Sequence, residues 1–238
     1  MVANVASISS DAYLERRLRV TSRVSVEGFG FSSEEEYKVG ELSPADRLKR
    51  IKSCYSATIM NETTISLKTN MRRLWADHAI WTRQYAVSAL DNAADMVAAK
   101  ERLLKTPDNI GNSFVQYYGE GTGRKLAELL RKHVLLGVDL IEFAKAGDQK
   151  NFETQDSKWT VNADEIAGFL SQTNPHWAKD DMFDLLHQHL TLTKKQVEAR
   201  LDKRWDDDVA AFDDVFTEIN TVADTISQGI MKHFPDKF

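Results

Sequence analysis

The sequence predicts an all-α protein, an antiparallel helical bundle of about five long helices that follows an N-terminal extended arm. From about Leu67 onward, apolar residues recur every three or four positions, which is the spacing of an amphipathic helix. The 238 residues include only 11 Gly and 4 Pro, too little turn punctuation for many short strands. We therefore expect two parts, an extension over residues 1–66 and a helical-bundle domain over residues 67–238.

The extension has a different residue pattern from the bundle. Arg19 to Phe31 alternates apolar and polar residues, a weak signal for a strand or an extended arm. Ser43 and Pro44 form a typical helix start, a capping residue followed by proline, and predict a short helix over residues 43–53. Because this region is short and polar, we interpret it as an arm that packs on the bundle or on a partner.

Proline, glycine and polar clusters divide the bundle into helices. The expected helices cover residues 68–105 with a bend near residues 91–92, then 107–118, 123–145, 151–171, 179–201 and 205–232. Gly147 suits a helix C-terminal cap, and Pro175 and Pro235 each follow a helix end. The connections are short, which favours antiparallel neighbours.

Three histidines occupy equivalent places in three of these helices, in the segments LWADHAIWT, LLRKHVLLG and LLHQHLTLT. Large apolar residues precede each histidine by four and three positions, and another follows it by three. His78, His133 and His189 are therefore expected to face the core. A buried imidazole needs a polar partner, because an unsatisfied polar group in a core costs roughly 1–3 kcal/mol.

Three interpretations of these histidines remain open, and a catalytic role is the third beside the two that follow. In the first, each imidazole bonds a carbonyl, Asn or Asp across the bundle. In the second, the three histidines and Asp77 bind a divalent transition metal, since imidazoles from several helices form iron and zinc centres. The paired Glu-x-x-His motifs of ferritin-like proteins and the H-E-x-x-H zinc motif are missing. The candidate partners in a polar core are Asn162, Asp213 and Asn220.

The chain also contains an internal echo. Trp75 and His78 have the same spacing as Trp159 and Asn162. Each pair is followed by an apolar helix, a proline turn and an LLxxH helix, with His133 in the first copy and His189 in the second. One interpretation is a duplicated helical hairpin, in which Asn162 takes the place of His78 and is a candidate for its buried partner.

Composition excludes several classes of protein. The net charge is -5 and both signs are interleaved, so we expect no nucleic-acid partner. A single cysteine, Cys54, excludes an intrachain disulfide framework and fits the cytoplasm or another reducing compartment. No apolar run approaches the ~20 residues of a membrane span, and the first residues lack the apolar core of a signal peptide.

Several segments in order carry a resemblance to a known family. They are LWADHAIWTRQYAVSAL, RLLKTPDNIGNSF, YYGEGTGRKLAELLRKHVLLGVDLIEFAKAGD, NADEIAGFLSQTNPHW and VADTISQGIMKHFP. Over about Met71 to Phe238, the chain resembles a family of small helical proteins common in soil bacilli. The resemblance implies the helical fold and supplies no biochemical role. In that family the residue before each helix histidine tends to be acidic, which Asp77 matches and Lys132 and Gln188 do not.

Two functions are therefore expected as alternatives. No catalytic constellation is recognised, which favours a non-enzymatic structural or interaction module in an assembly. Its N-terminal arm would bind a protein partner or a second copy of the chain. The alternative is a metal-binding bundle protein, in the manner of ferritin or haemerythrin, that uses the interior histidines.

Overall fold

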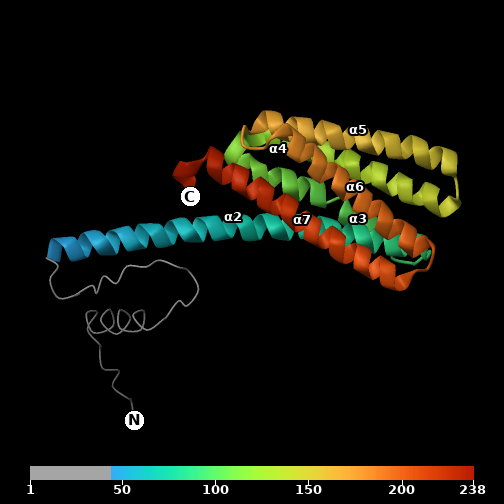
Figure 1. Ribbon diagram of the computed structural model, residues 1–238, viewed down its shortest axis with the longest axis horizontal. Coiled ribbons are helices and arrows are strands. Elements are labelled where there is room, and N and C mark those ends of the chain that lie inside the picture. The colour runs from blue at the N-terminus through green and yellow to red at the C-terminus, as the bar shows by residue number, and fades with distance from the viewer. Residues whose placement is uncertain (1–43) are drawn as a thin grey trace, which may run out of the picture. The chain divides into compact units, whose positions relative to one another are not determined.

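A computed structural model describes the backbone of residues 44–238 and the side chains of residues 62–238. The described part is all-α, as predicted, and residues 50–238 form one compact unit. Its elements are α2 (Pro44–Leu90), α3 (Met96–Leu103), α4 (Thr106–Ala146), α5 (Gln149–Thr173), α6 (Lys179–Leu201), α7 (Trp205–His233) and the 3₁₀ turn η1 (Pro235–Lys237) (Figure 1). None of the helices in these residues is long and apolar enough to span a membrane.

Helix α2 differs from the expectation for the extension. The short helix expected to end near residue 53 begins at Pro44 but continues to Leu90. The physical reason is the absence of proline and glycine between Pro44 and Leu90, since neither helix-breaking residue occurs within α2 after its first position. The expected boundary at residue 66 therefore lies within α2. The strand signal over residues 19–31 lies outside the described residues.

Two breaks shape the first half of the bundle. The expected bend near residues 91–92 is a turn between α2 and α3, in which Asn92 takes a left-handed φ of 54°. The helices expected over residues 107–118 and 123–145 are joined in α4 across a kink at Gly119, with φ 82° and ψ 166°. Glycine tolerates this conformation because it has no Cβ. The two halves of α4 meet so closely that a Cβ on Gly111 would lie 2.4 Å from the carbonyl oxygen of Gly123.

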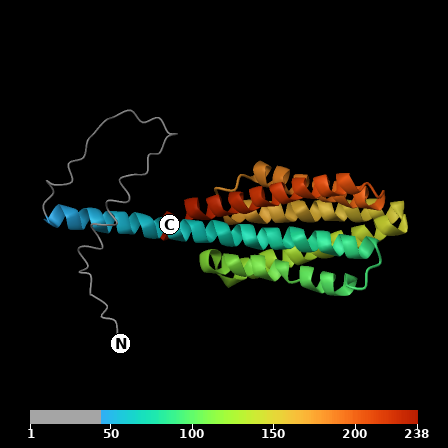
Figure 2. The same cartoon turned by 90° about the horizontal axis from the view of Figure 1, so that it is seen from below.

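Successive helices pack side by side as an antiparallel bundle. Helix α5 packs on α4, α6 on α5, and α7 on α6 (Figures 1 and 2). Side-chain bonds join α2 to α4 and to α7, through Tyr85 with Glu142 and Arg72 with Asp224. The shared core is apolar and includes Met71, Phe114, Leu126, Ile166, Leu170, Trp177, Ile219, Ile226 and Ile230. This packing places the inward faces of α2, α4 and α6 around one interior.

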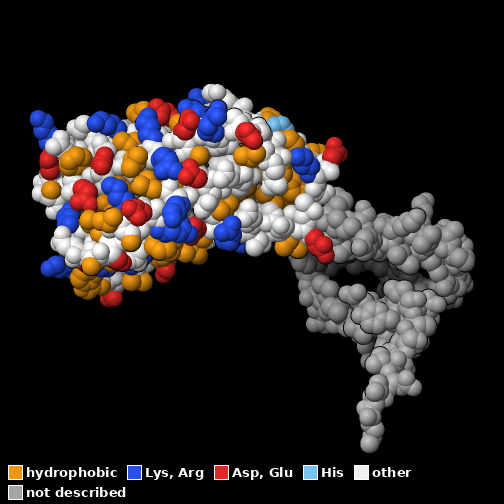
Figure 3. Space-filling view, turned by 180° about the vertical axis from the view of Figure 1, so that it is seen from behind, with side chains coloured by type: hydrophobic (Ala, Val, Ile, Leu, Met, Phe, Trp, Pro, Cys, Tyr) orange, Lys and Arg blue, Asp and Glu red, His pale blue; other side chains and the backbone are white. Residues whose placement is uncertain are grey.

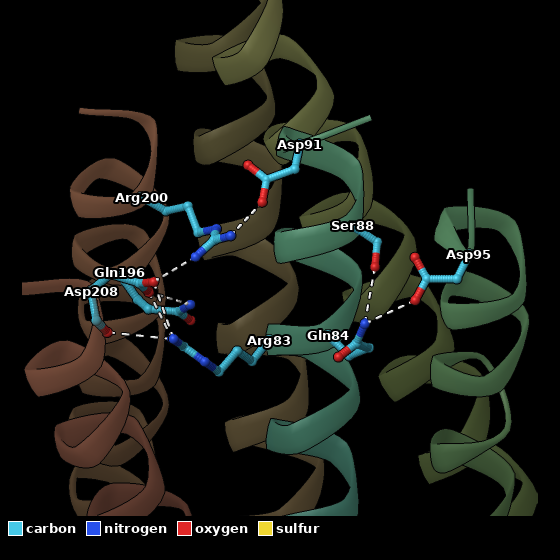
Figure 4. A network of polar contacts seen from close by, with 8 residues as sticks. All are labelled: Arg83, Gln84, Ser88, Asp91, Asp95, Gln196, Arg200 and Asp208. Atoms are coloured by element: carbon cyan, nitrogen blue, oxygen red, sulfur yellow. Dashed lines mark hydrogen bonds and ion pairs between the residues drawn. The ribbon is translucent and has the colours of Figure 1, made fainter. Parts of the chain in front are cut away.

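A network of hydrogen bonds and ion pairs links α2, α6 and α7 at one end of the bundle (Figure 4). The buried carboxylate of Asp208 on α7 accepts hydrogen bonds from Arg83 on α2 at 2.7 and 3.1 Å. It also accepts from Gln196 and Arg200 on α6, each at 3.1 Å, and Arg200 pairs with Asp91 as well. Asp208 therefore links α7 to both α2 and α6. Outside this network, acidic and basic side chains are interleaved on the face drawn in Figure 3.

Candidate functional site

The three predicted histidines lie inside the bundle on three different helices. His78 on α2, His133 on α4 and His189 on α6 are 6%, 5% and 5% exposed. The ring centroid of His189 lies 5.9 Å from that of His78 and 6.0 Å from that of His133. The structure therefore gathers three side chains that are far apart in the sequence around one interior point.

Each imidazole is held through Nδ1 by a residue of the following helix segment. The Nδ1 atom of His78 lies 3.2 Å from Thr106 Oγ1, and that of His189 lies 3.0 Å from Glu218 Oε2. The Nδ1 atom of His133 lies 3.1 Å from Asn162 Oδ1. The partners follow their histidines by 28, 29 and 29 positions, so one arrangement is used three times.

The partners fix which ring nitrogen carries the proton. The Thr106 hydroxyl already donates to the carbonyl of Leu103, so it accepts from His78. The Asn162 amide donates to the carbonyl of Leu129, which leaves Oδ1 as an acceptor for His133. A carboxylate such as that of Glu218 accepts as well. In each of the three rings Nδ1 is then the donor, and a ring in its neutral form keeps a lone pair on Nε2.

The Nε2 atoms of the three rings make no hydrogen bond within the part of the chain described here. The three rings line one small cavity of about 30 Å³ inside the bundle. Its other lining residues include Thr82, Tyr85, Leu103, Val134, Gly137, Trp159, Thr193 and Val197. Trp159 packs on the His133 ring at a centroid distance of 5.1 Å, and its Nε1 donates to the His133 carbonyl. The ring of His133 is thus fixed from two sides.

Burial keeps two of these imidazoles neutral. It lowers the pKa of His78 to about 3, an effect to which repulsion by His189 adds. Burial also lowers the pKa of His133 well below its ordinary value, and repulsion by His189 and His78 acts in the same direction, while the bond to Asn162 opposes it. Near pH 7 both rings are therefore in the neutral form that binds metal ions.

The other sequence candidates have different places. Asp77 does not line the cavity and forms an ion pair with Arg102, 2.7 Å from each carboxylate oxygen. Asn162 is fully buried but bonds His133, not His78 as the echo suggested. Asp213 is exposed, and Asn220 donates to the carbonyl of Phe216 on its own helix.

Sequence reasoning missed Thr106, Glu218 and Thr193. Glu218 is 5% exposed, and its second oxygen, Oε1, is buried without a partner among residues 62–238. Thr193, four positions after His189, is 5% exposed, and its hydroxyl is likewise buried without a partner in this part of the chain. These two unsatisfied groups lie at the site, on α7 and α6.

The sequence contains a threefold repeat, and recognising it would have identified Thr106 and Glu218 as partners of the histidines. His133 follows His78 by 55 positions, and His189 follows His133 by 56. The segments TPDNIGNSFVQ, NADEIAGFLSQ and EINTVADTISQ begin with Thr106, Asn162 and Glu218, and all three end in glutamine. The echo is therefore better described as three helical hairpins than as two. They are α2 with α3 and the first half of α4, the second half of α4 with α5, and α6 with α7.

Fold and site together define an all-α bundle with an interior cluster of three histidines. Across residues 62–238, no group of three or more His, Cys, Asp or Glu side chains stands as it is in an arrangement that could hold a metal ion. Comparisons of the chain with protein-family models, with curated proteins and with solved structures find no match.

Proposed function

We propose that this chain is a metal-binding helical-bundle protein, in which the Nε2 atoms of His78, His133 and His189 bind one divalent first-row transition metal ion. The observation that supports the proposal is the common orientation of the three rings. Each Nδ1 is bonded to a side chain of another helix, and all three rings line the same cavity. A metal cation between the rings would bind their Nε2 lone pairs together, and imidazole nitrogen is a preferred ligand of zinc, copper, iron and nickel.

The rings need only a small movement to reach a ligating geometry. Three imidazoles around a tetrahedral metal ion, with metal–nitrogen bonds of about 2.0–2.1 Å, have ring centroids about 5 Å apart. The centroids of His78 and His133 lie 5.9 and 6.0 Å from that of His189. Closure by about 1 Å in each of these two pairs would bring His78 and His133 to that spacing from His189.

The outer partners match those of known metal-binding histidines. Such histidines donate their second ring nitrogen to a carboxylate, a carbonyl or water, which fixes the ring and raises its basicity. Glu218 and Asn162 supply oxygens of this kind to His189 and His133, and the Thr106 hydroxyl does so for His78. Asp77 is engaged by Arg102, so we leave it out of the proposed ligand set.

Elemental analysis tests the proposal. Protein freed of any affinity tag is dialysed against Zn²⁺ and then against buffer, and its zinc content is measured. We expect one zinc per chain, with a large loss in His133→Gln. His187→Gln is the matched control, because His187 is an exposed histidine that pairs with Asp164. Background zinc in the unaltered protein, or equal zinc in both variants, would contradict the proposal.

The role of the N-terminal extension stays a prediction. Residues 1–43, which were expected to bind a protein partner or a second copy, lie outside the described residues. A scaffold role in an assembly is compatible with an interior metal ion. Membership of the bacterial family that the chain resembles is likewise a proposal, and that family supplies no biochemical activity.

A further inference from the structure

A stripe of exposed apolar side chains runs along the outer face of α7. Its four members follow one another at spacings of four, three and four positions, so they lie on one side of the helix: Trp205, Val209, Phe212 and Phe216. Trp205, Val209 and Phe216 are 50%, 55% and 38% exposed. An amphipathic helix in a bundle buries its apolar side chains, so this second apolar stripe is not explained by the packing of the core.

Ile80 on α2 extends this stripe into a patch. The two helices lie side by side and run antiparallel (Figure 2). The guanidinium of Arg83 lies 4.7 Å from the centroid of the Phe212 ring. Ile80 precedes Arg83 by three positions and Phe216 follows Phe212 by four, so Ile80 lies level with Phe216, and it is 47% exposed. We call Ile80 and the α7 stripe the apolar patch. Contiguous exposed apolar patches mark interaction sites.

The charges beside the apolar patch on α7 are negative. From Trp205 to Met231, α7 contains no Lys or Arg. Asp206 and Asp213 are exposed and form no ion pair within residues 62–238. They lie three positions before and four positions after Val209, so both flank it on the helix surface. A partner for this surface therefore needs apolar side chains together with positive charge.

One segment of the sequence has this composition. Residues 16–26, RRLRVTSRVSV, contain four arginines and no acidic residue. The even-numbered positions from 18 to 26 hold Leu or Val except at Ser22, and the odd-numbered positions from 17 to 23 hold Arg except at Thr21. Alternate side chains of an extended peptide share a face. Bound in that form, the segment would present an apolar face to the patch, and its long arginines would reach the carboxylates at the border.

We infer that residues 16–26 of a second copy of this chain bind the apolar patch. Within one chain the connection is barely long enough. Ile80 follows Pro44 by 36 positions, which is about 54 Å along α2. Residues 27–43 span at most about 56–61 Å, so binding within one chain would require nearly all of them to be fully stretched. Reciprocal binding between two copies has no such limit and gives a closed dimer. This inference is independent of the metal site.

The mass of the full chain in solution, measured by light scattering, tests the inference. We expect the mass of two chains for the unaltered protein. Replacing the four arginines of residues 16–26 with glutamine should give the mass of one chain, and so should Val209→Asp. Val161→Asp is the matched control and should stay dimeric, because Val161 is also 55% exposed but lies on α5. Circular dichroism checks that each variant keeps its helices.

A disulfide shows which chain supplies the segment. In a Cys54→Ser background, Val20→Cys combined with Val209→Cys should form a covalent dimer on oxidation, and Val20→Cys combined with Val161→Cys should not. A disulfide within one chain would overturn the inference, because the patch would then be bound by its own chain. A monomeric unaltered protein would overturn it as well, as would a dimer that survives both the arginine replacements and Val209→Asp.

Discussion

His189 donates from Nδ1 to Oε2 of Glu218 over 3.0 Å, and the side chains are 6% and 3% exposed. In the other two hairpins the equivalent position holds an uncharged residue, Thr106 or Asn162. The third hairpin therefore brings a carboxylate into contact with the histidine cluster. In a proposed metal site, this charge would offset part of the charge of a divalent cation and raise the basicity of the His189 ring.

Glu218→Gln should weaken metal binding while leaving the bundle folded. Glutamine keeps an acceptor oxygen for His189 but removes the charge, and loss of an outer partner typically lowers metal affinity 10–100-fold. Competition with a chromophoric chelator measures the affinity. Glu128→Gln is the control, because Glu128 is exposed on α4. Equal affinity in both variants would show that the carboxylate has no part in metal binding.

The metal-free protein should lose stability as the pH falls below about 6.5. In the unfolded chain, His78 takes up a proton near its ordinary pKa of about 6.5. In the folded state its pKa is about 3, so the folded ring stays neutral over this interval. The unfolded state then binds more protons, and each such group removes up to about 1.4 kcal/mol of stability per pH unit. Urea unfolding at pH 7.0 and 5.5 measures the effect. A His78→Gln variant with an equally steep pH dependence would contradict it.

Gly111→Ala should destabilise the bundle by more than about 1–3 kcal/mol, the usual cost of overpacking, because the added methyl group meets backbone. The Cβ would lie 2.4 Å from the carbonyl oxygen of Gly123 across the kink of α4. Gly168→Ala is the matched control, since its Cβ would meet nothing within 4 Å. Alanine is also the better helix former there, by about 0.5–1 kcal/mol. Thermal unfolding should therefore shift in opposite directions in the two variants.

Asp208→Asn should cost about 3–5 kcal/mol, the range for breaking a buried ion pair. Burial alone would raise the pKa of Asp208, but hydrogen bonds from Arg83, Gln196 and Arg200 outweigh it and lower the pKa below its ordinary value. The substitution leaves these arginines without their shared charge partner. Asp207→Asn changes an exposed pair with Arg204 and should cost less than about 1 kcal/mol. Similar urea midpoints for the two variants would contradict the role of Asp208.

Much of the fold could be predicted from local signals. The expected helix over residues 179–201 matches α6, and the one over residues 205–232 ends one residue before α7 does. Apolar periodicity and turn residues suffice for these elements, because both act over a few positions. The same local signals predicted the start of α2 at Pro44 correctly but placed its end near residue 53, whereas the helix continues to Leu90.

The candidate site could be predicted only in part. The apolar stripes were enough to place His78, His133 and His189 in the core. Their partners lie 28 or 29 positions away on other helices, so no pattern within one helix finds them. Matching Trp75 and His78 to Trp159 and Asn162 aligns the repeats in the wrong register. It therefore suggests Asn162 as the partner of His78, whereas Asn162 bonds His133. Aligning the chain on the three histidines gives a threefold repeat, and Glu218 then falls beside His189.

X-ray absorption spectroscopy of the zinc-loaded protein identifies the ligands of the metal ion, because imidazole ligands give a distinctive multiple-scattering pattern. If the three histidines bind zinc, the spectrum should show three imidazole nitrogens at about 2.0–2.1 Å from the metal ion. His133→Gln should reduce the number to two. A spectrum of zinc bound by oxygen alone, with no imidazole pattern, would contradict the assignment of His78, His133 and His189 as ligands.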